Sequence, residues 1–237
     1  ETARLTDPAA DALVRRAGGN PFFLEELALA SPAGETPGQD LPDTVQAVME
    51  ARVATLKPAH RAVLYAIAVI GPPASQALVA GLLGLDPVIL RAHIAHLVAA
   101  GFLTEGDTGV AFRHMLLHDT AYAMIAPPDR ARLHGEVVRL LETGADPTRP
   151  EPLPETLALH AQEAGDTGRA LDYWIRASNA AIYRAAGQAA IAFARQGLAL
   201  VDPERPESAL QEMRLQLSLA PALMAQSGYG AQDVGRA

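Results

Sequence analysis

The sequence is dominated by short segments with the hydrophobic periodicity of an α-helix, separated by Gly and Pro residues. The segment 43–56 is representative, because its apolar residues recur at steps of three and four. They are Val45, Val48, Met49, Val53 and Leu56. This spacing places them on one face of a helix. A later segment begins with Asp86-Pro87, an N-cap followed by proline at the first helical position. We therefore expect many short, packed helices.

The composition favours the same conclusion. Apolar residues make up 49% of the 237 residues, but aromatic residues only 5%. The core must therefore be built mainly from Ala, Leu, Val and Ile, which favours closely packed helices over sheets. The length allows two compact units or one elongated array, because domains usually contain about 100 to 150 residues.

Three helical segments, 60–70, 75–83 and 87–100, precede a stretch of different character. In residues 101–113, two short runs flank the turn sequence Gly106-Asp107-Thr108-Gly109, which is typical of a two-stranded hairpin. Three helices followed by a hairpin is the order of a winged helix.

Residues 155–226 return to helical periodicity with short turns between the helices. Small residues stand where antiparallel helices would cross closely. They are Ala170, Ala177, Ala181, Ala190 and Ala194. This pattern predicts stacked helix pairs, as in an α-solenoid.

The charge and residue content exclude several function classes. The formal net charge of −8 gives a mean surface field that repels nucleic-acid phosphates and anionic membranes. The sequence has no cysteine, which excludes disulfides, thiol nucleophiles and cysteine-ligated metals. The longest apolar run, residues 62–70, is about half of the ~20 residues that a membrane helix needs, and the first residues do not read as a secretion signal. We expect a cytoplasmic protein without a membrane partner.

The sequence contains no catalytic constellation. A phosphate-binding loop needs glycines and a lysine beside Ser or Thr, but Lys57 is the only lysine and stands in Thr55-Leu56-Lys57-Pro58. No serine lies in a Gly-x-Ser-x-Gly elbow, and no Glu-x-x-His or His-Glu-x-x-His pairing suggests a catalytic metal. We predict no catalytic residues and no enzymatic activity for this chain.

Two pairs among the seven histidines have helical spacing: His93 with His96, and His114 with His118. Each pair could share a helix face and bind a metal, or could consist of ordinary surface or interior histidines. No third ligand is apparent near either pair in the sequence, so no metal site is predicted.

A winged helix can place its third helix in the major groove of DNA. Here that helix, 87–100, offers only Arg91 and two histidines among apolar residues. The wing carries Glu105 and Asp107, where phosphate contacts would require Lys or Arg. An internal packing domain is favoured over a DNA reader.

The stretch Gly19-Asn20-Pro21-Phe22-Phe23-Leu24-Glu25-Glu26-Leu27 resembles the glycine-x-proline element that closes the lid of STAND-type signalling ATPases. Residues 41–48, 51–53 and 68–71 resemble the lid exit and winged-helix entry of the large bacterial regulators in this family. Those regulators are linked to class III adenylate cyclases or to LuxR-type DNA-binding domains.

Later stretches agree with this family in order. Phe112-Arg113-His114 and residues 132–134 resemble the end of its winged helix and the helix that follows. Leu159-His160-Ala161 and residues 165–174 resemble the start of its tetratricopeptide-like array, in which Gly197 replaces the usual Ala. The resemblance implies a mainly α fold class: a winged helix with a small β-hairpin, followed by an α-solenoid of tetratricopeptide-like helix pairs.

Pro- and Gly-rich stretches are typical of linkers, and they divide the chain into four expected parts. Residues 1–40 would be an ATPase lid remnant and linker, and 41–126 a winged-helix domain. Residues 127–150 would be a connecting helix and linker, and 151–237 tetratricopeptide-like helical repeats.

In that family, the proline of the glycine-x-proline element packs near the adenine, and a winged-helix histidine contacts the phosphates of bound ADP. By position, the resemblance assigns nucleotide binding in an intact parent to Gly19, Asn20, Pro21 and His114. Two alternatives remain: His114 could be a capping or core histidine, and Gly-Asn-Pro could be a turn between two helices. No cofactor is expected in the chain itself, whereas the parent would bind ADP or ATP with Mg²⁺.

The resemblance implies a non-catalytic regulatory and sensor segment that couples the ADP/ATP state of a parent ATPase to a cyclase or transcriptional output. Its partners would be an upstream nucleotide-binding domain of the same chain and a protein or small-molecule effector on the repeats. The chain begins within a pattern and without Met, so we expect a fragment. Two other hypotheses remain: a DNA-binding winged-helix transcriptional regulator, and a stand-alone tetratricopeptide-like interaction adaptor.

Overall fold

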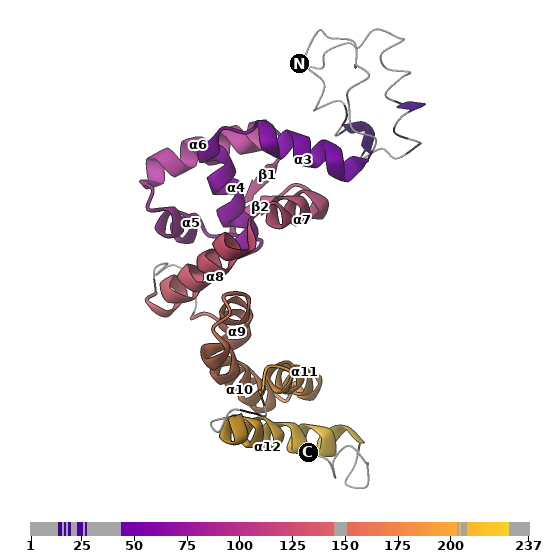
Figure 1. Ribbon diagram of the computed structural model, residues 1–237, viewed down its shortest axis with the longest axis vertical. Coiled ribbons are helices and arrows are strands. Elements are labelled where there is room, and N and C mark those ends of the chain that lie inside the picture. Colours follow the sequence, from indigo (N-terminus) through magenta and orange to yellow (C-terminus); the bar gives the residue numbers. More distant parts are fainter. Residues whose placement is uncertain are drawn as a thin grey trace. The chain divides into compact units, whose positions relative to one another are not determined.

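The computed structural model describes residues 14, 15, 17, 19, 23–25, 27, 44–144, 151–202, 204 and 208–227. The chain divides into two compact units, Glu1–Ala126 (unit 1) and Pro127–Ala237 (unit 2), and each is described by itself. In the described residues the protein is mainly helical with a small antiparallel sheet (Figure 1). The sequence prediction of helices with one hairpin is confirmed at this level.

Unit 1 contains five described helices and one hairpin. In chain order these are α3 (Val45–Thr55), α4 (Pro58–Ile70), α5 (Gln76–Leu83), α6 (Pro87–Ala99), β1 (Leu103–Gly106), β2 (Gly109–Phe112) and α7 (Met115–Ala123). Asp86 caps α6 as predicted: its Oδ1 accepts a hydrogen bond from the Val88 N–H at 2.8 Å, and Pro87 begins the helix. The local sequence signals thus determine where this helix starts.

The hairpin is joined to the segment between α4 and α5. β1 and β2 pair antiparallel, with Leu103 opposite Phe112. Ala74, which precedes α5, exchanges two backbone hydrogen bonds with Val110 of β2, at 2.7 and 2.9 Å. Gly109 allows this approach, because a Cβ there would lie 2.4 Å from the Ala74 carbonyl oxygen.

The core of unit 1 lies between α4, α6, α7 and the hairpin, and it is almost wholly apolar. Its members include Leu64, Ile67, Leu90, Ile94, Leu97, Leu103, Val110 and Leu117. Arg52 of α3 is a buried exception: its Nη2 donates to the Ala100 carbonyl at 2.8 Å, and its guanidinium lies 4.6 Å from the Phe102 ring centroid. This charge is therefore stabilised by a hydrogen bond and a cation–π contact, which also tie α3 to the end of α6.

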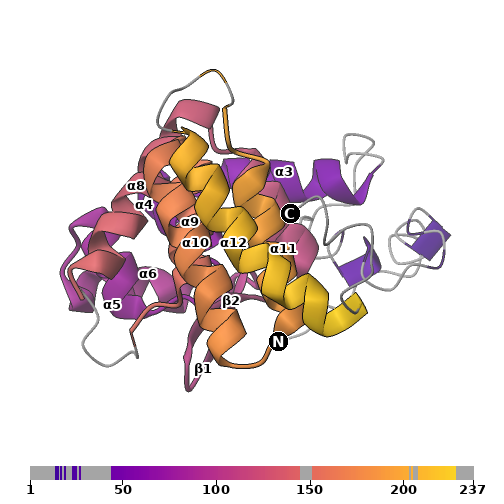
Figure 2. The same cartoon turned by 90° about the horizontal axis from the view of Figure 1, so that it is seen from below.

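Unit 2 is a succession of helices, each packed on the next. They are α8 (Pro127–Glu142), α9 (Pro154–Glu163), α10 (Thr167–Tyr183), α11 (Gly187–Leu198) and α12 (Ser208–Ser227). α10 also packs against α12, and Figure 2 shows these last helices overlapping in the view from below. Residues 127–150 were expected to form a connecting part. In the structure α8 packs on α9 within the same unit, and it includes both Pro127 and Pro128, which its first turn tolerates.

Small side chains let the helices of unit 2 approach closely. The alanines singled out in the sequence, at 170, 177, 181, 190 and 194, are all fully buried. Trp174 of α10 fills the space beside them. Its ring stacks on Phe193 with centroids 5.7 Å apart, and its Nε1 donates to Gln162 Oε1 at 3.2 Å.

In the described residues, no single helix is long and apolar enough to cross a membrane. α5 and α6 reach that length and apolarity only as a pair, which is bent by 111°.

Gly197 of α11 has no space for a side chain. A Cβ there would lie 2.7 Å from Leu215 Cδ2 and 3.2 Å from Trp174 Cβ, and Leu215 is fully buried. This crowding gives a physical reason for glycine at position 197.

Gly197→Ala should therefore destabilise unit 2. Overpacking a core costs about 1 to 3 kcal/mol, which outweighs the ~1 kcal/mol that alanine gains over glycine in helix propensity. Urea unfolding followed by the fluorescence of Trp174, the single tryptophan, measures this unit. Gly168→Ala is the matched control, because the nearest atom to its Cβ would be Asp166 Oδ1 at 3.8 Å. Equal stability of Gly197→Ala and the wild type would contradict the observed packing.

Candidate functional site

The predicted site residues lie in unit 1. Asn20 and Pro21 fall outside the described residues. Gly19 has a φ of +82°, a left-handed conformation that glycine adopts without strain. His114 is the N-cap residue of α7, with extended backbone, but its side chain does not cap the helix. Of the two alternatives for His114, the capping role is therefore wrong; the imidazole is half-buried.

The structure brings the segment after Pro21 to the residue before His114. Arg113 Nη2 lies 3.0 Å from Glu25 Oε1, and both side chains are about half exposed, at 45% and 41%. An ion pair this exposed contributes at most about 1 kcal/mol. Its importance is positional, because it connects two stretches that are 88 residues apart in the sequence.

Apolar contacts hold the same segment on α3. Phe23 and Leu27 are buried in a small cluster with Ala17 and with Val48 of α3. Glu25 therefore lies on a segment whose neighbouring side chains are packed against α3. Sequence reasoning missed this arrangement; the only signal for it was a pair of opposite charges, which is too common to single out.

An exposed apolar pair follows His114 directly. Met115 is 65% exposed and Leu116 is 37% exposed at the start of α7. Arg113, which pairs with Glu25, precedes His114, so charged, imidazole and apolar residues follow one another at the end of the hairpin.

His118, one turn after His114, has a structural role. Its Nδ1 lies 2.9 Å from Asp119 Oδ1, and its Nε2 lies 3.1 Å from the Ala68 carbonyl of α4. The ring also packs edge-on against Phe112. Because both ring nitrogens are engaged, a metal shared between His114 and His118 would break an existing contact.

The outer surface of α6 and the hairpin is not basic. Val88 is 73% exposed and Ile89 is 51% exposed on α6. The Glu105 carboxylate of β1 accepts a hydrogen bond from Gln76 of α5. This surface lacks the cluster of Lys and Arg that phosphate contacts need.

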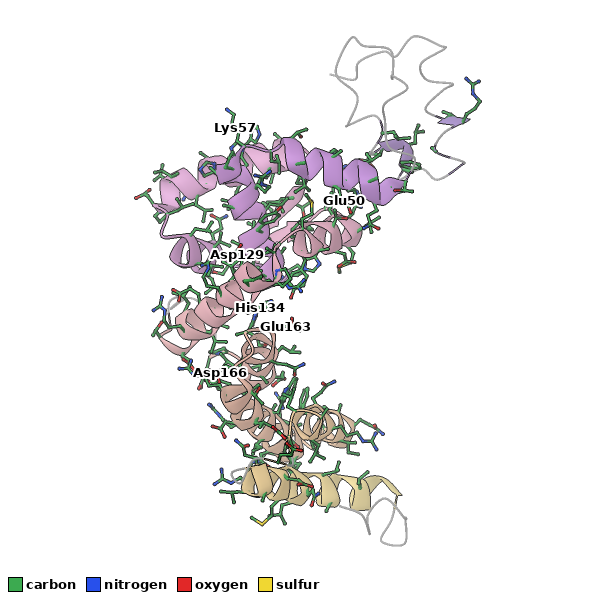
Figure 3. All side chains as sticks on the ribbon, viewed as in Figure 1. Glu50, Lys57, Asp129, His134, Glu163 and Asp166 are labelled. Atoms are coloured by element: carbon green, nitrogen blue, oxygen red, sulfur yellow. The ribbon has the colours of Figure 1, made fainter. Side chains whose placement is uncertain are left out.

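A buried histidine pair joins the first two helices of unit 2. His134 of α8 and His160 of α9 have their Nδ1 atoms 2.8 Å apart, so one donates and the other accepts. Burial lowers the pKa of each to about 4, with Arg130 adding to the effect at His134 and Glu163 opposing it at His160. Figure 3 labels His134 and Glu163 in this region. Both imidazoles are neutral at pH 7, and their hydrogen bond links α8 to α9.

Comparison with protein-family models, curated proteins and solved structures finds no match to this chain.

The histidine pair should make unit 2 sensitive to acid. The folded pKa of about 4 lies below the ordinary value of 6.5, so between these values the unfolded chain binds more protons. The stabilisation is present above pH 6.5 and is lost as the pH falls toward 4.

Thermal unfolding followed by Trp174 fluorescence across this pH range measures the effect. The double variant His134→Gln/His160→Gln can keep a side-chain hydrogen bond without titrating, so its Tm should fall less steeply with decreasing pH. Identical pH slopes for the two proteins would contradict the assignment.

Proposed function

We propose that this chain is a non-catalytic regulatory segment of a STAND-type signalling ATPase, with a lid remnant and a winged helix in unit 1 and tetratricopeptide-like repeats in unit 2. It would couple the nucleotide state of a preceding domain to an effector bound on the repeats. The output would be a cyclase or a transcriptional domain of the parent protein.

The order of elements in unit 1 supports the winged-helix part of the proposal. α4 is followed by the Ala74 bridge, then by α5, α6 and the β1–β2 hairpin. A winged helix needs such a third backbone segment on its hairpin, because the wing is otherwise an isolated two-stranded ribbon with little stability. The apolar and acidic outer surface favours an internal packing role over DNA reading.

The packing of unit 2 supports the repeat part. Successive helices pack on one another, and α10 also contacts α12, which is the nearest-neighbour pattern of a solenoid. Fully buried alanines and Gly197 occupy the closest crossings.

The Glu25–Arg113 ion pair is the observation that carries the functional proposal. It joins Glu25 to Arg113, the residue before His114, and this contact supports a shared role for the two stretches that the resemblance assigns to the nucleotide. A diphosphate could then be contacted by the His114 imidazole while its base packs near Pro21.

The proposed mechanism is a two-position switch. ADP held by the preceding domain would bridge to Pro21 and His114 and favour the closed arrangement. A ligand on the repeats would favour the open arrangement, and each ligand would weaken the binding of the other. Such coupling usually amounts to about 1 to 3 kcal/mol, so each ligand would change the affinity for the other by roughly 5- to 150-fold.

His114→Ala in the full-length parent should therefore reduce ADP retention and raise effector output. The reason is that the closed state would lose its phosphate contact while the fold keeps its core. The measurement is the amount of nucleotide extracted from the purified protein, together with the activity of its output domain.

The control for this experiment is Arg91→Ala, at an exposed position of α6. It should retain ADP as the wild type does. Arg113→Ala should have a smaller effect in the same direction as His114→Ala. The proposal fails if His114→Ala changes neither ADP retention nor output.

A DNA-binding regulator is the main competing function. On the present proposal, the purified chain should not shift duplex DNA in a gel even at low salt, because α6 and the hairpin lack a basic surface. A shift that weakens steeply with added salt would favour the DNA-binding alternative instead.

A further inference from the structure

His118 of α7 lies where this helix packs against the last turn of α4 (Figure 1). Its side chain is only 20% exposed. The Nδ1 atom lies 2.9 Å from Asp119 Oδ1, and the Nε2 atom lies 3.1 Å from the carbonyl oxygen of Ala68. The imidazole ring therefore stands between two oxygen atoms that belong to different helices.

Both of these oxygen atoms are hydrogen-bond acceptors. A backbone carbonyl cannot donate, and neither can an ionised carboxylate, which is the form that exposed aspartates take at neutral pH; the Asp119 side chain is 61% exposed. A neutral imidazole has one N–H and one bare nitrogen, so it can donate to only one of the two oxygens. An imidazolium donates to both. The two contacts of His118 are thus satisfied together only by the charged ring.

The sequence of α4 provides a second reason for a positive charge at this position. In a continuing helix, the Ala68 carbonyl would accept the N–H of the residue four positions later, but that residue is Pro72 and has no N–H. The C-terminal end of a helix also carries a partial negative charge, which favours a nearby cation. Because α4 has no basic residue in its own last turn, His118 of α7 supplies both the donor and the charge.

The groups in contact with the ring favour its charge. Asp119 is the ionisable group within hydrogen-bond distance. Tyr122 stacks on the ring with centroids 6.1 Å apart, and Phe112 of β2 meets it edge-on with centroids 5.3 Å apart. The opposing group on α7 is His114, one turn earlier, because protonation of both imidazoles would make them repel each other.

The other elements packed against α7 are α3, α4 and β2. The charged side chains of α4 are in its first turn, at the end opposite Ala68, and Arg52 of α3 binds the Ala100 carbonyl. The charged and titratable residues of these elements, with the residue that follows β2, are Glu50, Arg52, His60, Arg61, Tyr65 and Arg113. Among the described residues, none of these six forms an ion pair or a ring contact with His118.

We propose that His118 is held as an imidazolium and forms a pH-dependent link between α7 and the C-terminal end of α4. Loss of its proton removes one of the two hydrogen bonds and the positive charge at the helix end, so α7 is then held less firmly on α4. This stabilisation is present while the folded protein keeps the proton, and it is lost as the pH rises through the titration of His118. The sign is opposite to that of the His134–His160 pair in unit 2, which acid weakens.

The test uses the whole chain labelled with ¹⁵N, and NMR follows the ring nitrogens of His118 from about pH 5 to about pH 9. The His118→Gln variant identifies these signals, because they are missing from its spectrum. We expect that the loss of the ring proton is accompanied by faster amide hydrogen exchange in residues 115–123, after correction for the intrinsic effect of pH. In His118→Gln, exchange in this helix should not depend on pH after the same correction.

Asp119→Asn is the decisive variant, because its amide can donate to Nδ1 while a neutral ring donates from Nε2 to Ala68. His118 should lose its proton about half a pH unit lower than in the wild type, and protection of α7 should no longer depend on pH. His96→Gln, at an exposed position of α6, is the matched control and should leave both results unchanged. Circular dichroism verifies that each variant is folded.

Two results would overturn the proposal. One is titration of His118 at the same pH in the wild type and in Asp119→Asn. The other is protection of α7 that stays constant in the wild type while His118 loses its proton.

Discussion

The close approach of helix backbones at small side chains is the constraint on which much of this structure depends. With few aromatic residues available, the core cannot be filled by large rings between widely spaced helices. In unit 2, buried alanines and Gly197 bring α10, α11 and α12 together, and one tryptophan fills the remaining space. Such packing leaves little tolerance for added volume, because protein interiors are close to crystalline density.

In both units, buried polar side chains link one helix or strand to another through hydrogen bonds and ring contacts. Arg52 binds the Ala100 carbonyl and the Phe102 ring, and His118 reaches the Ala68 carbonyl. His134 and His160 bind each other across α8 and α9. Each of these interactions gives a buried polar group a partner and so offsets the free-energy cost of removing it from water.

The end of the hairpin is the place where the proposed function and the fold meet. The Ala74–Val110 bridge holds the hairpin on the helices, and Arg113 pairs with Glu25. If the segment that carries Glu25 changed position, Arg113, the residue next to His114, would lose this contact or move with it. Under the proposed function, which requires an element with two discrete arrangements, the exposed Glu25–Arg113 pair would be the contact that breaks and re-forms.

The sequence by itself determined the local structure: the start of α6 at Asp86-Pro87, the hairpin turn at Gly106–Gly109, and the alanines that face other helices. These features depend on neighbouring residues and on helical periodicity, so they can be read without knowing the fold. Which distant groups meet depends on how the helices pack. This packing brought His60 to His93 and His96, Glu25 to Arg113, and His134 to His160, and it left Gly197 no room for a Cβ. Such contacts follow from how helices pack, and one sequence contains no local signal for them because each partner is far away along the chain.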